Sequence, residues 1–205
     1  MERRGSVEDQ RSASSDEFSE IRRALAELAG SSWPLISRHA LSRLRRARLL
    51  HARAAWRVEV IEGELRSSLL SQRLLGARRR REEVLRFVRI SSRRLKCTCE
   101  DAIFTASIAE RRLPRAAEAA GLSIEIPSGA LAGYCLCKHV ISELARALRR
   151  GLVKLEGETL ETLAVALLAL SLRCVGGEEV ASGMRGLLSR GLRTLVSRGE
   201  VRLLN

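Results

Sequence analysis

Cysteine is concentrated in two short segments of this 205-residue chain, and a histidine closes the second of them. We expect a cytoplasmic chain, in which thiols stay reduced, so this grouping points to a metal ion before it points to disulfides. Zinc takes four tetrahedral ligands and accepts both thiolate and imidazole. Cys-x-Cys brings two thiolates to one ion from a strand end, and Cys-x-His at a helix start adds two ligands. The two segments are Cys97-Thr98-Cys99 and Cys135-Leu136-Cys137-Lys138-His139.

The two segments resemble the SWIM zinc finger, whose pattern is Cys-x-Cys, a variable spacer and Cys-x-His. The resemblance is carried by Cys97-Thr98-Cys99 and Cys137-Lys138-His139-Val140-Ile141, and it covers residues 84–150. It implies one structural zinc ion bound by Cys97, Cys99, Cys137 and His139. It also implies a ββα finger, here with a long insertion, because 37 residues separate Cys99 from Cys137. Cys135 is the alternative to His139 as the fourth ligand.

The remaining cysteine and histidines stand apart from this pattern. Cys174 lies on an apolar stretch, so we expect it to be a core residue. His39 and His51 lie in basic helical surroundings and are interpreted as surface or packing residues. The alternative interpretation of the whole group is a set of scattered core cysteines with a chance histidine.

Positive charge is concentrated in one third of the chain. Residues 31–100 carry 18 basic and 6 acidic side chains, a net +12 out of +13 for the whole chain. Such a field favours a polyanion, and nucleic acid is the commonest one in a cell, although a generic basic surface is the alternative. Aromatic residues make up only 3%, so few bases can be stacked and we expect weak sequence specificity. The candidate phosphate contacts are Arg78, Arg79, Arg80, Arg81, Arg93, Arg94, Lys96 and Lys138, together with the helix that carries Arg43 to Arg48.

Periodicity predicts an α+β fold that is mostly helical, with a small antiparallel sheet. We expect helices over 16–29, 35–52, 102–121 (broken by Pro114), 140–150, 158–174 and 178–197. We expect strands at 56–61, 84–90, 124–126 and 201–204, the first in a hairpin. The chain is then divided into a mobile polar tail (1–15), a basic helix and hairpin region (16–83), the SWIM-like finger (84–150) and a C-terminal helical region (151–205).

Hydrophobic residues make up 45% of the chain, so a packed core is expected. The longest apolar run, 163–172, is half the length that a bilayer requires, and no apolar segment follows Met1. We therefore expect a cytoplasmic protein without membrane contact. Arginine outnumbers lysine 34 to three, and side-chain amides are limited to Gln10, Gln72 and Asn205, which fits a thermophilic source.

These features predict a non-catalytic, zinc-dependent protein that binds nucleic acid, with DNA as the preferred candidate. No phosphate-binding loop of the Gly-x-x-x-x-Gly-Lys-Ser/Thr type and no acidic catalytic triad is present. Small stand-alone SWIM proteins resemble the family that partners recombinase paralogues, so the resemblance implies a role in homologous recombination and DNA repair beside a RecA-like partner. The alternative is a protein-interaction adaptor with a purely structural zinc site, whose helices over 158–174 and 178–197 dock on a partner.

Overall fold

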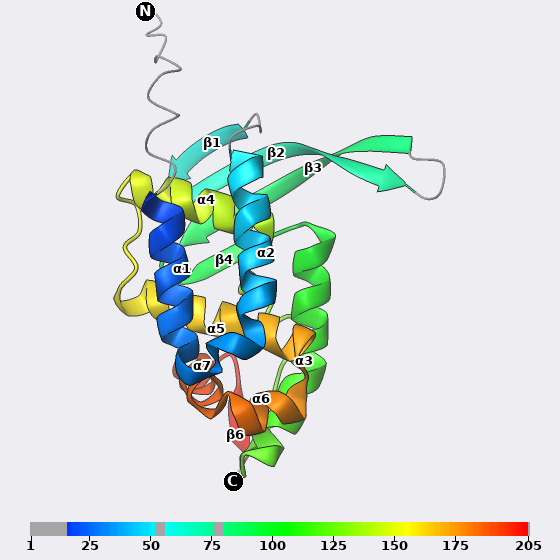
Figure 1. Ribbon diagram of the computed structural model, residues 1–205, viewed down its shortest axis with the longest axis vertical. Coiled ribbons are helices and arrows are strands. Elements are labelled where there is room, and N and C mark those ends of the chain that lie inside the picture. The colour runs from blue at the N-terminus through cyan, green and yellow to red at the C-terminus, as the bar shows by residue number, and fades with distance from the viewer. Residues whose placement is uncertain (1–15, 52–55, 76–79, 205) are drawn as a thin grey trace, which may run out of the picture.

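The structure, a computed structural model, describes residues 16–51, 56–75 and 80–204 (Figure 1). The helices are α1 (Asp16–Ala29), the 3-10 turn η2 (Gly30–Ser32), α2 (Trp33–His51), α3 (Glu100–Ala119), α4 (Lys138–Arg149), α5 (Gly157–Cys174), α6 (Gly177–Gly183) and α7 (Arg185–Ser197). The strands are β1 (Trp56–Ile61), β2 (Glu64–Leu75), β3 (Arg80–Ser91), β4 (Arg94–Cys97), β5 (Ser123–Glu125) and β6 (Arg202–Leu204). The prediction of a mixed α+β fold, mostly helical with a small antiparallel sheet, is confirmed. The expected mobile tail, residues 1–15, lies outside the described residues.

Two helices separated by one tight turn form the first part of the fold. α1 buries Ile21, Leu25 and Leu28, which lie on one face because they are spaced four and three residues apart. Gly30 has a φ of +54°, a left-handed conformation that glycine adopts without strain, and it opens the turn η2. α2 then packs against α1 and α4.

The predicted hairpin joins β1 to β2 through Glu62 and Gly63. Both residues have positive φ, +52° and +75°, as a type I′ turn requires. The backbone twist of this turn matches the twist of the strands, so Ile61 and Glu64 pair directly on either side of it.

The main sheet has the strand order β1-β2-β3-β4, and every neighbouring pair is antiparallel. One face carries the buried side chains Leu65, Val88, Ile90 and Leu95 and packs against α4, while the other face is exposed. β2 and β3 are longer than their outer neighbours. Among the described residues, 70–75 pair only with 80–85, so a two-stranded ribbon projects from the body of the molecule (Figure 1).

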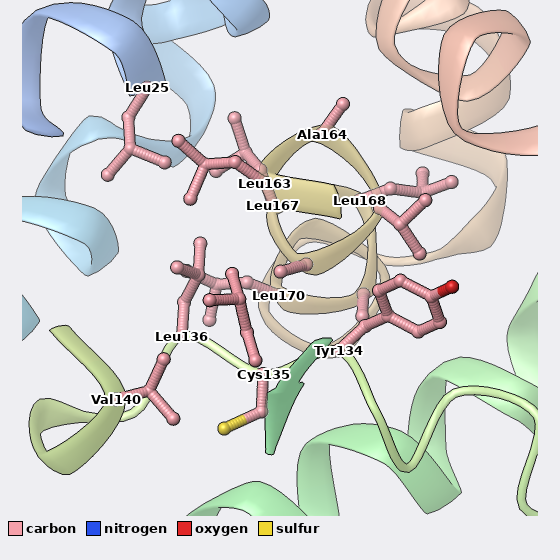
Figure 2. Packing of buried hydrophobic residues seen from close by; sticks show 14 of the residues in the cluster. Leu25, Tyr134, Cys135, Leu136, Val140, Leu163, Ala164, Leu167, Leu168 and Leu170 are labelled. Atoms are coloured by element: carbon pink, nitrogen blue, oxygen red, sulfur yellow. The ribbon is translucent and has the colours of Figure 1, made fainter. Parts of the chain in front are cut away.

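α5 lies at the centre of the hydrophobic core and contacts α1, α2, α3, α7 and β4. Figure 2 shows Leu163 and Leu167 on the side of Leu25 and Leu168 on the opposite side. A Cβ atom at Gly191 in α7 would lie 2.6 Å from Leu168 Cδ2, so glycine at this position lets α7 approach α5 closely. The apolar surface of α5, which the adaptor hypothesis assigns to a partner, is therefore covered by the chain itself.

Two helix predictions are wrong. The expected single helix over 178–197 is divided into α6 and α7 at Met184, which is buried, and Ser32 Oγ donates a 2.6 Å hydrogen bond to the carbonyl of Gly183 at the end of α6. α3 also continues past Pro114 to Ala119. Proline removes one backbone hydrogen bond, but α3 packs against α5 and α6 and its Leu113 is fully buried, and this packing outweighs the loss.

Candidate metal centre

The first two donors follow the hairpin formed by β3 and β4. Cys97 ends β4 and pairs with Val88 of β3, and the Thr98 N–H donates a 3.0 Å hydrogen bond to the Phe87 carbonyl just beyond. Cys99 then occupies the N-cap position of α3, which begins at the next residue. A strand end and a helix start, only two residues apart, thus fix both thiols.

The second pair of donors is placed by a segment that runs parallel to β4. The Leu95 N–H donates to the Gly133 carbonyl at 2.8 Å, and the Cys135 N–H donates to the Leu95 carbonyl at 2.9 Å. The chain then enters α4, with Cys137 at its N-cap and His139 in its first turn. These backbone contacts bring two segments that are 37 residues apart in the sequence to one place.

Cys97, Cys99, Cys137 and His139 form a cluster whose ligand atoms all lie within 4.8 Å of one another. All four are buried, with exposed fractions of 5%, 5%, 2% and 5%. His139 Nδ1 lies 3.8 Å from Cys97 Sγ and 3.9 Å from Cys137 Sγ. Tetrahedral zinc with normal bond lengths places sulfur and nitrogen ligands roughly 3.6 Å apart, so the donor set fits a zinc ion.

Backbone N–H groups and two helix N-termini favour negative charge at this cluster. The Cys99 N–H lies 3.4 Å from Cys97 Sγ, and the Val140 N–H lies 3.5 Å from Cys137 Sγ. α3 and α4 both begin here, and the positive ends of their dipoles stabilise thiolates. Such contacts are typical outer-shell partners of metal-bound sulfur.

Hydrogen bonds between the thiols shift their pKa values in opposite directions. Burial opposes ionisation of Cys137, but hydrogen bonds from Cys135, Cys97, Cys99 and His139 outweigh it and hold the pKa of Cys137 well below its usual range. Hydrogen bonds to Cys137 and Cys99, together with burial, raise the pKa of Cys97. The hydrogen bond with Cys137 raises the pKa of Cys99 to about 12. Cys137 is therefore the thiol of this cluster that ionises most readily.

Zinc affinity is expected to fall steeply as the pH falls. Bound zinc requires thiolates, whereas Cys97 and Cys99 carry protons in the metal-free state because their pKa is raised. Binding thus releases about two protons, and the apparent affinity should rise about 100-fold for each pH unit gained near neutrality. Competition with a chelator of known pH dependence measures this slope. A slope near zero would mean that these two thiols are not ligands.

Cys135 is buried but is not one of the four clustered donors. It interacts with Cys137, two residues further on, and its side chain lies beside β4 in Figure 2. The geometry thus groups His139, not Cys135, with the other three thiols. Cys174 is half-buried at the end of α5 and is also outside the cluster.

The structure separates the residues predicted to contact phosphate. Arg94 and Lys96 are exposed on the outward face of β4, while Lys138 is exposed at the start of α4. Arg93 forms an exposed ion pair with Glu158, at 2.6 Å from Nη2 to Oε1. Arg80 and Arg81 lie at the projecting end of β3, and Arg78 and Arg79 lie outside the described residues.

The sequence analysis did not identify two groups of cations as candidate binding residues. Arg66 and Arg89 lie on the same exposed sheet face as Lys96, and the alternation of side chains along a strand is the signal that could have identified them. Arg86 and Arg173 lie near Cys99 although they belong to β3 and α5, and no local sequence pattern connects them.

Comparison with protein-family models, with curated proteins and with solved structures gives no match for this chain. Within residues 16–51, 56–75 and 80–204, no helix has the length and apolar composition needed to cross a membrane.

Proposed function

We propose that this chain is a non-catalytic zinc protein that binds nucleic acid, with DNA as the preferred candidate. The binding surface in this proposal is the exposed face of the four-stranded sheet. The buried cluster of Cys97, Cys99, Cys137 and His139 supports the zinc site, and it is the observation that carries the proposal. Four protein donors fill a tetrahedral zinc ion and leave no position for a reactive water, so the role of the ion is structural. Cys97 at the end of β4, Cys137 at the N-cap of α4 and His139 in α4 supply three of the donors, and β3 pairs with β4. We interpret β3, β4 and α4 as the ββα finger that the resemblance to SWIM proteins implies, with α3 and β5 as the insertion.

The exposed face of the sheet supports binding to a polyanion. Arg66, Arg89 and Lys96 lie directly opposite one another on β2, β3 and β4. Like charges in such positions repel, and a bound phosphate backbone removes the repulsion. Arg66 contacts Glu64 at 2.7 Å, whereas Arg89 and Lys96 have no ion-pair partner among the described residues.

The same face also offers an aromatic ring and a basic ribbon. Phe87 is 49% exposed and adjoins the row of cations, so a base can stack on it. The ribbon formed by β2 and β3 leads to the arginines at 78–81, and a two-stranded ribbon fits the major groove of B-DNA (Figure 1).

The double variant Arg89→Gln/Lys96→Gln is expected to weaken binding to duplex DNA at least tenfold at low salt. If about six phosphates are engaged, the slope of log affinity against log salt is near −5. Each lost contact makes this slope less steep by about 0.9, so the loss of two contacts should change it to about −3. Fluorescence anisotropy at several salt concentrations measures both quantities. Zinc content should stay at one ion per chain.

The matched control is Arg190→Gln/Arg193→Gln, which removes two exposed cations from α7. Equal losses in the two double variants would show that net charge alone governs binding and would contradict a role for the sheet face. Replacement of the arginines at 78–81 by serine tests the ribbon in the same assay.

The setting that we propose follows from the resemblance to stand-alone SWIM proteins: assistance to homologous recombination and repair beside a RecA-like recombinase paralogue. Co-purification after nuclease treatment tests it. A protein partner retained without nucleic acid, together with a flat salt dependence of DNA binding, would favour the adaptor function instead.

A further inference from the structure

A basic cavity of about 460 Å³ adjoins the metal cluster on the side of α2. It lies where α2, β3, the N-termini of α3 and α4, and the C-terminus of α5 meet. Its lining consists of His39, Arg43, Arg46, Arg86, Cys99, Glu100, Asp101, Cys137, Lys138, His139, Arg173 and Cys174. Three of the four clustered donors thus face this cavity as well as one another.

The cavity keeps a positive charge even when the metal is counted. Its lining has five cationic and two carboxylate side chains, a net charge of +3. A zinc ion with three thiolates adds −1 and leaves +2. Asp101 is already engaged, because Arg43 contacts it at 3.1 Å and Arg173 also pairs with it. Arg46 and Lys138 have no ion-pair partner among the described residues.

One buried ring nitrogen in this lining lacks an acceptor. His139 directs Nδ1 at the thiols, and its Nε2 is buried without a hydrogen-bond partner among the described residues. When Nδ1 binds a metal, Nε2 carries the proton, and metal-bound histidines nearly always donate this proton to an oxygen. The described residues thus leave one hydrogen-bond donor of a lining residue without an oxygen acceptor.

We propose that this cavity binds the terminal phosphate of a nucleic acid strand, an inference that rests on the proposed function. Guanidinium and ammonium groups from α2 and α4 and the N-termini of two helices suit a dianionic phosphate with free oxygens. The flat sheet face suits a strand that continues in both directions, whereas a concave pocket with cations on several sides suits the free oxygens of a terminal phosphate. Arg46 and Lys138 are the phosphate contacts.

The test compares short DNA oligonucleotides that carry a 5′-phosphate, a 3′-phosphate or no phosphate, with inorganic phosphate as a fourth probe. One of the phosphorylated strands should bind about tenfold more tightly than the unphosphorylated strand. Arg46→Gln/Lys138→Gln should abolish this preference and keep the zinc content. The matched control Arg45→Gln/Lys154→Gln removes two cations outside the cavity and should keep the preference.

The outcomes separate this inference from the proposed function. Salt-dependent DNA binding with no preference for a phosphorylated end overturns the cavity proposal alone. A rise in unfolding temperature with inorganic phosphate, lost in Arg46→Gln/Lys138→Gln but without end preference, supports a phosphate site and overturns the strand end as its source. Loss of zinc from Arg46→Gln/Lys138→Gln, with no effect of any phosphate, would show that these cations serve the thiolates and would overturn the proposal.

Discussion

Replacement of His139 by alanine is expected to remove most of the bound zinc and to cause the largest loss of stability of any substitution considered. Structural zinc contributes on the order of 10 kcal/mol to folding in small zinc domains, and three thiols alone leave the ion with an open position. The cluster joins β4 to the starts of α3 and α4, so its loss releases three elements at once. Zinc analysis and urea unfolding measure the two effects on the same sample.

Cys135→Ser is the matched control for this prediction. Cys135 is buried beside the cluster but is not one of the four clustered donors, so zinc should stay at one ion per chain and the loss of stability should be about 1–2 kcal/mol. An empty site in Cys135→Ser, with zinc retained in His139→Ala, would reverse the choice of the fourth ligand. That result would give a site made entirely of thiolates.

The donors could be predicted from the sequence because each pair is local. Cys97 and Cys99 are two residues apart, as are Cys137 and His139, and a pair that ends a strand or begins a helix needs only short-range structure. What joins the two pairs is a backbone contact between Leu95 and Gly133, for which the sequence contains no signal. The choice between Cys135 and His139 as the fourth donor therefore depends on tertiary structure and cannot be made from the sequence.

The surroundings of the charged side chains are harder to predict from the sequence than the metal donors, because they too depend on tertiary structure. A run of arginines shows a strong field but not the direction of each side chain. Arg93 and Arg94 are neighbours, yet Arg93 pairs with Glu158 and Arg94 lies on the outward side of the sheet. The basic cavity gathers cations from four elements separated by up to about 130 residues, so only the folded chain shows it.

One buried charge connects the metal-bearing helix to the sheet. Glu143 lies on α4, one turn after His139, and its side chain is fully buried. It accepts a hydrogen bond from Ser67 of β2 and forms an ion pair with Arg146, at 3.0 Å from Oε1 to Nε. A carboxylate in such a place is stable only while its partners compensate for the lost water.

Arg146→Met is therefore expected to lower the free energy of unfolding by about 3–5 kcal/mol, because it leaves the Glu143 carboxylate buried with one hydroxyl donor. The double variant Glu143→Gln/Arg146→Met should regain most of this loss, since an amide needs no counter-charge and still accepts from Ser67. Urea unfolding of the four proteins in the cycle measures the coupling between the two residues. Losses that simply add would mean that Arg146 stabilises α4 by packing alone, and zinc retained throughout would show that the ion pair supports the helix and not the metal.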